Sequence, residues 1–263
     1  MLNTTFTHLP GVGPATEKKF FDAGVNCWED ALNKELPCSQ AKQNSLRAGI
    51  RESLERLEAG DAFWFGNALP ASEQWRLYPH FSQQAAYVDI ETSGLHDCCH
   101  ITSIALYDGN SVRAYVYGEN LEDFADDILP YKLLVSWNGR GFDAPILRRH
   151  LQIPLDKGDM AHLDLLPVYR KLGFRGGLKK TEQRLGLGRN ELDGIDGLAA
   201  VWLWQAYERS SDRRYLETLL AYKVADVLSL EFLAEYALSL LSPPSVKPLP
   251  SPDRVRTDLN PFR

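Results

Sequence analysis

The stretch that decides the fold is Tyr87-Val88-Asp89-Ile90-Glu91-Thr92-Ser93-Gly94-Leu95. An apolar run from Ala85 to Ile90 predicts a buried strand, and Ser93-Gly94 predicts the turn that ends it. Asp89 and Glu91 are two positions apart, so their side chains project from the same face of the strand. Two neighbouring carboxylates in a half-buried strand repel each other and are costly to desolvate. No Lys or Arg lies nearby in the sequence, so a divalent cation is the simplest neutralising partner.

An isolated Asp-x-Glu pair would more simply be a strand end with solvated or capped acids. Two other stretches supply further carboxylates. Asp143 follows an apolar strand and opens a helix, where it could equally be the helix N-cap. Tyr222 and Asp226 are four positions apart and share one face of a helix that is apolar around them. An Asp in such a helix is poorly placed without a partner.

The pattern around these motifs predicts an α/β domain. Strands are expected at Ala85–Ile90, His100–Tyr107, Val112–Tyr117, Lys132–Trp137 and Met160–Leu165. Asp108-Gly109-Asn110 is a tight-hairpin signal between the second and third strands. Helices are expected at Leu121–Leu129, at Asp143–Leu151 and, interrupted by glycine turns, from the end of the fifth strand to Leu241. A three-stranded meander followed by alternating helix and strand is the order of the ribonuclease H-like fold, a mixed sheet flanked by helices.

Residues 1–60 are expected to form a small, separate all-α domain. Gly11 and Gly13 lie in a glycine-rich turn that opens an amphipathic helix, and Lys18 and Lys19 occupy its first turns. This pattern resembles a helix-hairpin-helix module, in which backbone N–H groups and a helix N-terminus hold a nucleic-acid phosphate. A structural or protein-binding hairpin is the alternative. Residues 61–84 are expected to be a linker packed across the domain junction, 85–241 the α/β domain, and 242–263 a proline-rich, disordered tail.

Composition indicates an ordinary soluble globular protein, with 44% hydrophobic and 24% charged residues. The first residues show no basic start followed by an apolar run, and the four cysteines lack zinc-type spacing, so we expect a cytoplasmic protein without membrane contact. The net charge of −6 conceals a basic segment, Arg170 to Arg189, in which Glu182 is the single acid. Such a segment suits a phosphate-binding surface beside a metal site, or a solvated helix face.

With its motifs in this order, the chain resembles a 3′→5′ exonuclease of the DEDD superfamily, in the branch of polymerase proofreading domains and YprB-like ribonuclease H-like proteins. The first exonuclease motif matches Asp89-x-Glu91, the second matches 138–143, and the third matches Tyr222-x-x-x-Asp226. The segment 177–186 also resembles the YprB-like branch. The resemblance covers Ala85 to about Leu241. Ser93 is a mild departure, since the family often has Thr there.

The resemblance implies that Asp89, Glu91, Asp143 and Asp226 bind two Mg²⁺ or Mn²⁺ ions, which prefer such hard oxygen ligands. Family members orient the attacking water with a His five positions before the last Asp or a Tyr four before it. Tyr222 fills the second position, which is typical of the tyrosine type. With a free phenol pKa of about 10, it would orient water rather than deprotonate it. The implied contacts to nucleic acid are Thr92, Leu95, Asn138, Lys179 and Lys180.

The sequence therefore predicts a divalent-metal-dependent 3′→5′ exonuclease acting on single-stranded nucleic acid or 3′ overhangs, with DNA favoured over RNA. Two alternatives stay open. One is a non-catalytic nucleic-acid-binding module of the same fold. The other is a structure-specific endonuclease or an RNA exonuclease that uses the same metal site.

Overall fold

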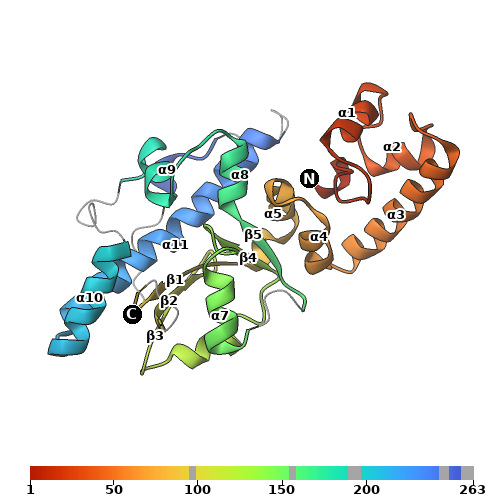
Figure 1. The fold of residues 1–263 in the computed structure, drawn as a ribbon. Helices are drawn as coiled ribbons and strands as arrows, with labels where there is room; N and C mark the ends of the chain where they lie inside the picture. The colour runs from red at the N-terminus through yellow and green to blue at the C-terminus, as the bar shows by residue number, and fades with distance from the viewer. Residues whose placement is uncertain (95–98, 154–157, 189–196, 243–248, 256–263) are drawn as a thin grey trace.

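The computed structural model describes residues 1–94, 99–153, 158–188, 197–242 and 249–255. Its centre is a five-stranded sheet with strand order β3-β2-β1-β4-β5. The strands are β1 (Ala85–Thr92), β2 (Ile101–Tyr107), β3 (Val112–Val116), β4 (Leu133–Ser136) and β5 (Ala161–Asp164). The β1–β2 and β2–β3 pairs are antiparallel, whereas β1–β4 and β4–β5 are parallel. The predicted mixed sheet flanked by helices is confirmed (Figure 1).

Side chains alternate along β1 between two separate apolar cores. Tyr87 belongs to the core that also contains Val227 and Leu230 of α11 (Arg213–Leu241). Val88 and Ile90 belong to the other core, formed with α6 (Phe124–Asp127) and α7 (Asp143–Leu151). Because alternate residues share a face, the acids at 89 and 91 lie on the α11 side.

The helices after the sheet lie mainly along one face (Figure 1). They are α8 (Leu165–Lys171), α9 (Leu178–Arg184), α10 (Gly197–Ser210) and α11. The longest is α11, and it runs across the sheet with its apolar side buried against β1, β2 and β4. Asp212 caps its first turn by accepting a hydrogen bond from the Arg214 N–H at 3.0 Å. No helix within the described ranges is both long and apolar enough to span a bilayer.

The N-terminal part is helical, as expected. It contains a short 3₁₀ helix η1 (Leu2–Thr4) and the helices α1 (Pro14–Asp22), α2 (Trp28–Asn33) and α3 (Gln40–Glu58). Gly11 has a φ of +73° in the turn before α1, a conformation that favours glycine. The buried Glu17 carboxylate ties α1 to the chain start by accepting hydrogen bonds from Thr5 Oγ1 at 2.6 Å and Phe6 N–H at 2.7 Å.

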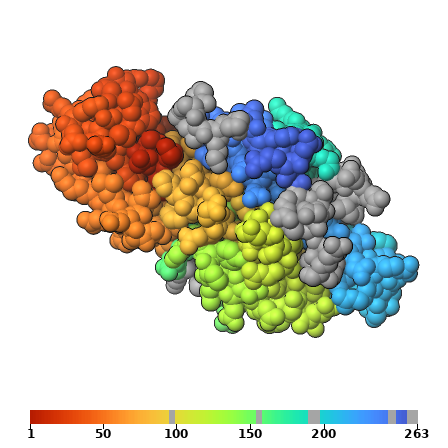
Figure 2. Space-filling model, turned by 180° about the vertical axis from the view of Figure 1, so that it is seen from behind, coloured from red at the N-terminus to blue at the C-terminus, as the bar shows by residue number. Residues whose placement is uncertain are grey.

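Residues 61–84 form a chain of short helices: α4 (Ala62–Ala68), η2 (Ala71–Leu77), α5 (Tyr78–Phe81) and η3 (Ser82–Gln84). They pack directly on the sheet. The Tyr78 hydroxyl is 2.7 Å from the Tyr87 hydroxyl of β1, and Glu73 of η2 pairs with Lys171 of α8. One apolar core runs from the N-terminal helices through this segment to the sheet. Figure 2 shows the N-terminal helices at one end of the molecule and α10 at the other.

The tail is described only at 249–255; its other residues, apart from Ser242, lie outside the described part of the chain. Pro252–Arg254 form a 3₁₀ turn (η6), and Arg254 forms an ion pair with Glu235 of α11 at 3.2 Å. These contacts were not expected from the proline-rich composition. They show that this short piece of the tail lies against the last helix.

Packing of α4 on β5 is tested by Gly66→Ala. An added Cβ would lie 2.8 Å from the Ala161 Cβ and 3.2 Å from its Cα. Alanine is favoured over glycine within a helix by about 1 kcal/mol, whereas overpacking costs about 1–3 kcal/mol. We therefore expect a net loss of stability in urea unfolding. Ala161→Gly removes the opposing methyl, so the double variant should recover part of the loss. A more stable Gly66→Ala protein would contradict this packing.

Candidate active site

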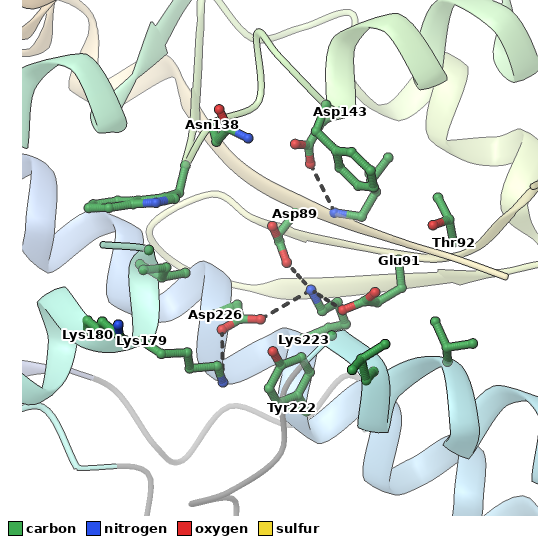
Figure 3. A pocket seen from close by; sticks show the side chains of 18 residues that line it. Asp89, Glu91, Thr92, Asn138, Asp143, Lys179, Lys180, Tyr222, Lys223 and Asp226 are labelled. Carbon is green, nitrogen blue, oxygen red and sulfur yellow. Dashed lines mark hydrogen bonds and ion pairs between the residues drawn. The ribbon is translucent and has the colours of Figure 1, made fainter. Parts of the chain in front are cut away.

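A cleft of about 570 Å³ lies beyond the C-terminal end of β4, beside the last residues of β1. Its walls come from β1, the start of α7, α9, the start of α10 and α11. Figure 3 shows the acidic side chains of three of these elements turned toward its centre. All four predicted metal ligands line it: Asp89, Glu91, Asp143 and Asp226.

The ammonium group of Lys223 lies at the centre of three of these carboxylates. Its Nζ makes a short contact with Asp89 Oδ2, and it is 2.9 Å from Glu91 Oε1 and 3.1 Å from Asp226 Oδ2. The Lys223 side chain is 3% exposed. A lysine ammonium has three N–H donors, so each can meet one carboxylate.

Lys223 is the functional residue that the sequence prediction missed. We expected a divalent cation because no basic residue lies close to Asp89 in the sequence, but the lysine that neutralises it comes from 134 positions later. The sequence nevertheless contains a signal for this lysine. Lys223 is a charge within an apolar helical run, next to Tyr222 and three residues before Asp226. A buried lysine in that setting needs an acidic partner.

Burial and mutual charge shift the pKa values in this cluster. Burial, followed by the neighbouring Asp226 and Glu91 charges, raises the pKa of Asp89 to about 6, although Lys223 opposes the rise. For Lys223, burial alone would lower the pKa, but the three carboxylates outweigh it and hold the pKa well above its ordinary value. The lysine is therefore a fixed positive charge at neutral pH.

Asp143 reaches the cluster from the opposite wall. β1 pairs with β4 only as far as Tyr87, so the later residues of β1 extend past the end of that neighbour. The Ile90 N–H donates to Asp143 Oδ1 at 3.2 Å. The simpler N-cap role is not what the structure shows, because Phe142 holds the cap position. Burial, followed by the negative charge of Asp89, raises the pKa of the Asp143 carboxyl well above its ordinary value.

Asp164 at the end of β5 organises the loop that leads to Asp143. Its carboxylate caps α8 by accepting the Leu166 N–H at 3.0 Å. It also accepts the N–H groups of Asn138 at 2.8 Å and Arg140 at 3.2 Å. Asn138 is held in a left-handed conformation with a φ of +61°, which costs a non-glycine residue energy. Asp164 therefore both caps a helix and fixes the loop that carries the second motif.

Beneath that loop, Ser136 Oγ and His162 Nε2 are 2.7 Å apart. Burial, followed by the nearby Arg140 charge, lowers the pKa of His162 to about 3, so the ring is neutral. Gly139 lies directly over this pair, and a Cβ there would fall 2.1 Å from Ser136 Oγ. The loop therefore packs directly on the Ser136–His162 pair, and any side chain at position 139 would collide with Ser136.

Tyr222 and Lys179 form the side of the cluster nearest α9. Lys179 Nζ lies 3.7 Å from the Tyr222 ring centroid and 3.7 Å from Asp226 Oδ1. Burial, followed by the negative charge of Asp226, raises the pKa of the Tyr222 phenol above its ordinary value. The phenol is therefore protonated at neutral pH, and Lys179 faces both its ring and the last acid of the motif.

The remaining predicted contacts divide into those at the cleft and those away from it. Thr92, Asn138 and Lys180 line the cleft, and the Thr92 hydroxyl donates to the Gly94 carbonyl at 2.7 Å. Leu95 lies outside the described residues. Four predicted nucleic-acid contacts lie in α1 or in the turn before it and do not line the cleft: Gly11, Gly13, Lys18 and Lys19. Lys18 is largely exposed and pairs with Asp22 at 2.8 Å.

The donor set agrees in chemistry with a divalent metal, since four carboxylates converge and hard oxygen ligands suit Mg²⁺ and Mn²⁺. The Lys223 ammonium sets the present spacing of three of them, Asp89, Glu91 and Asp226. In the described part of the chain, no three His, Cys, Asp or Glu side chains are grouped closely enough to hold a metal ion. Ammonium–carboxylate contacts are about 2.8 Å, whereas Mg²⁺ binds oxygen at about 2.1 Å, so the carboxylates must close in around a metal.

The fold and the acidic cleft define an α/β domain of the ribonuclease H-like class, and the comparison with known families agrees. The chain belongs to the RNase_H superfamily, whose family model matches residues 86–238. A solved structure that it resembles is the family B DNA polymerase from the hyperthermophilic archaeon Pyrobaculum calidifontis. The TM-score is 0.44 and the identity 19%, over 59% of this chain and 24% of that chain. The matched part of the chain spans about a quarter of the length of that polymerase. No curated protein matches the sequence.

The role of Asp164 is tested by Asp164→Ala against Asp212→Ala, a helix cap outside the cleft. Asp212→Ala should show only the modest loss of a partly exposed N-cap side chain. Asp164→Ala should cost about 2 kcal/mol or more, because two further N–H groups lose a charged acceptor. Urea unfolding of both variants measures the difference. Equal losses would mean that Asp164 serves only as a cap.

Proposed function

We propose that this chain is a divalent-metal-dependent 3′→5′ exonuclease of the tyrosine type, acting on single-stranded nucleic acid, with DNA favoured. The observation that carries the proposal is the convergence of four carboxylates from β1, α7 and α11 in one cleft, beside Tyr222. Membership in the RNase_H superfamily supports a nuclease. The direction of digestion rests on the resemblance of the three motifs to DEDD exonucleases.

Asp89, Glu91, Asp143 and Asp226 would hold two Mg²⁺ or Mn²⁺ ions. When bound, such ions lower the pKa of water and stabilise negative charge on both the attacking and the leaving oxygen of a phosphodiester. The protein holds its acids on three rigid elements for this task. Asp143 is fixed by a main-chain N–H, and the other three acids share the α11 side of the sheet.

Tyr222 would orient the attacking water through its hydroxyl. Because its pKa is raised, the phenol keeps its proton and acts as a hydrogen-bonding group rather than a base. Lys179 and Lys180, which line the cleft, would neutralise phosphate charge. Contacts to phosphates carry no base information, so this binding would not depend on sequence. The cleft volume lies within the range of about 300–1,000 Å³ that buries small ligands, which suits the end of a single strand better than a duplex.

Lys223 favours a second candidate. A lysine that already neutralises three acids is also what a non-catalytic nucleic-acid-binding module would need to keep its fold without metal. The two candidates differ in one result, which is whether purified protein degrades end-labelled strands when Mg²⁺ or Mn²⁺ is added. Ladders on DNA and RNA strands labelled at either end also give the polarity and the substrate, and separate exonuclease from endonuclease action.

Asp226→Asn should lower the cleavage rate by at least about a thousandfold, because losing a ligand removes several kcal/mol of transition-state stabilisation. Wild-type cleavage should likewise require Mg²⁺ or Mn²⁺ and stop in EDTA. Asp212→Asn, at the N-cap of the same helix, partly exposed and outside the cleft, is the matched control and should cleave normally. Circular dichroism confirms folding. Wild-type rates for Asp226→Asn, or full activity in EDTA, would reject the metal assignment.

Tyr222→Phe removes only the hydroxyl and keeps the ring against Lys179. We expect kcat to fall by about 10- to 100-fold with KM little changed, since misorientation of the nucleophile affects turnover rather than binding. Single-turnover cleavage of a labelled strand measures the chemical step directly. An unchanged rate would show that Tyr222 serves packing alone.

A further inference from the structure

We propose that Lys223 is a tethered cation that occupies the position of one divalent ion among Asp89, Glu91 and Asp226 and is displaced when that ion binds. This inference rests on the proposed function and deepens it. It concerns how the site exists without metal and how it loads, rather than the reaction itself.

The first support is the geometry of the lysine. Three carboxylates from two elements surround one nitrogen, with Nζ contacts of 2.9 Å to Glu91 and 3.1 Å to Asp226 and a shorter one to Asp89. This is the arrangement expected of ligands around a cation rather than of a pairwise salt bridge. Asp143 forms no part of it, since its carboxylate receives the Ile90 N–H. The acids thus divide into three around Lys223 and one on the facing wall.

The second support is that an ammonium and a metal ion cannot share this position. Both need the same carboxylate oxygens, and two positive charges a few ångströms apart repel strongly in a site of low exposure. Loading an ion here therefore requires Nζ to leave.

The third support is that the cleft offers space for the displaced Lys223 side chain. Its side chain itself lines the 570 Å³ cleft, and a lysine stem has four rotatable carbons. A displaced ammonium would lie in the space proposed for the nucleic-acid strand, where a phosphate can replace the carboxylates as its partner. Release would thus be easiest when metal and substrate are both present.

The displacement can be measured on the wild-type protein by competitive labelling of lysines with acetic anhydride and mass spectrometry, without and with Mg²⁺. In EDTA, Lys223 should be protected because its amine is buried and paired with three acids. Mg²⁺ should raise its labelling severalfold, because a displaced amine is open to the reagent in the cleft. Lys180 is the internal reference, exposed and on the same cleft, and its labelling should stay constant.

A second measurement uses Lys223→Met, with Lys180→Met as the matched loss of one charge from the same cleft. Calorimetric titration with Mn²⁺ should show binding to Lys223→Met at least about tenfold tighter than to wild type, because no ammonium has to be displaced. Lys180→Met should bind as wild type. In EDTA, thermal unfolding of Lys223→Met should occur well below that of wild type, because Asp89 and Glu91 lose their ammonium partner and Asp226 keeps the more distant Lys179 at 3.7 Å. Mn²⁺ should restore the unfolding temperature.

The outcomes separate this inference from the proposed function. If Mn²⁺ binds wild type and Lys223→Met with the same affinity, or Mg²⁺ binds without unmasking Lys223, the displacement is refuted while the metal-dependent nuclease stands. If Lys223→Met does not fold, the labelling of wild type alone decides. If neither protein binds Mn²⁺ at millimolar concentration, both the displacement and the metal-dependent function are refuted, and Lys223 is a structural counter-charge.

Discussion

The site depends on one charge balance, in which the Lys223 ammonium neutralises three carboxylates that are mostly removed from water. Two acids come from the central strand and the third acid and the lysine come from α11, so the interaction also fixes α11 on the sheet. Replacing one partner of such a buried group commonly costs about 3–5 kcal/mol, because a charge is left without compensation. The carboxylates that line the cleft are therefore also charges that the fold must neutralise.

Much of the fold was predictable because its signals are local. Alternating residues in β1, the Asp108-Gly109-Asn110 hairpin and the apolar runs of β4 and β5 each specify an element from a few neighbouring positions. The partner of Asp89 was not predictable in this way. It depends on how α11 is rotated against β1, which the apolar cores decide across 134 positions of sequence.

The structure of the segment 61–84 also depends on distant contacts rather than on local sequence patterns. Its 3₁₀ and short α-helical turns have no periodicity of their own, and they are ordered by burial of residues such as Trp75 and Tyr78 against the sheet. Asp143 is an intermediate case. It was recognised as an acid at a helix start, but only the structure shows that it receives the Ile90 N–H, and that Asp164 receives two N–H groups from the loop before Asp143.

The register of β1 has a consequence for how the molecule folds. A shift by one residue would carry Asp89 and Glu91 into the apolar core against α7 and move Val88 and Ile90 to the charged side. The acid cluster and both cores therefore form together or not at all. A chain caught in the wrong register would lack the lysine cluster, so protection of the Lys223 amine would distinguish correctly folded molecules from compact but misregistered ones.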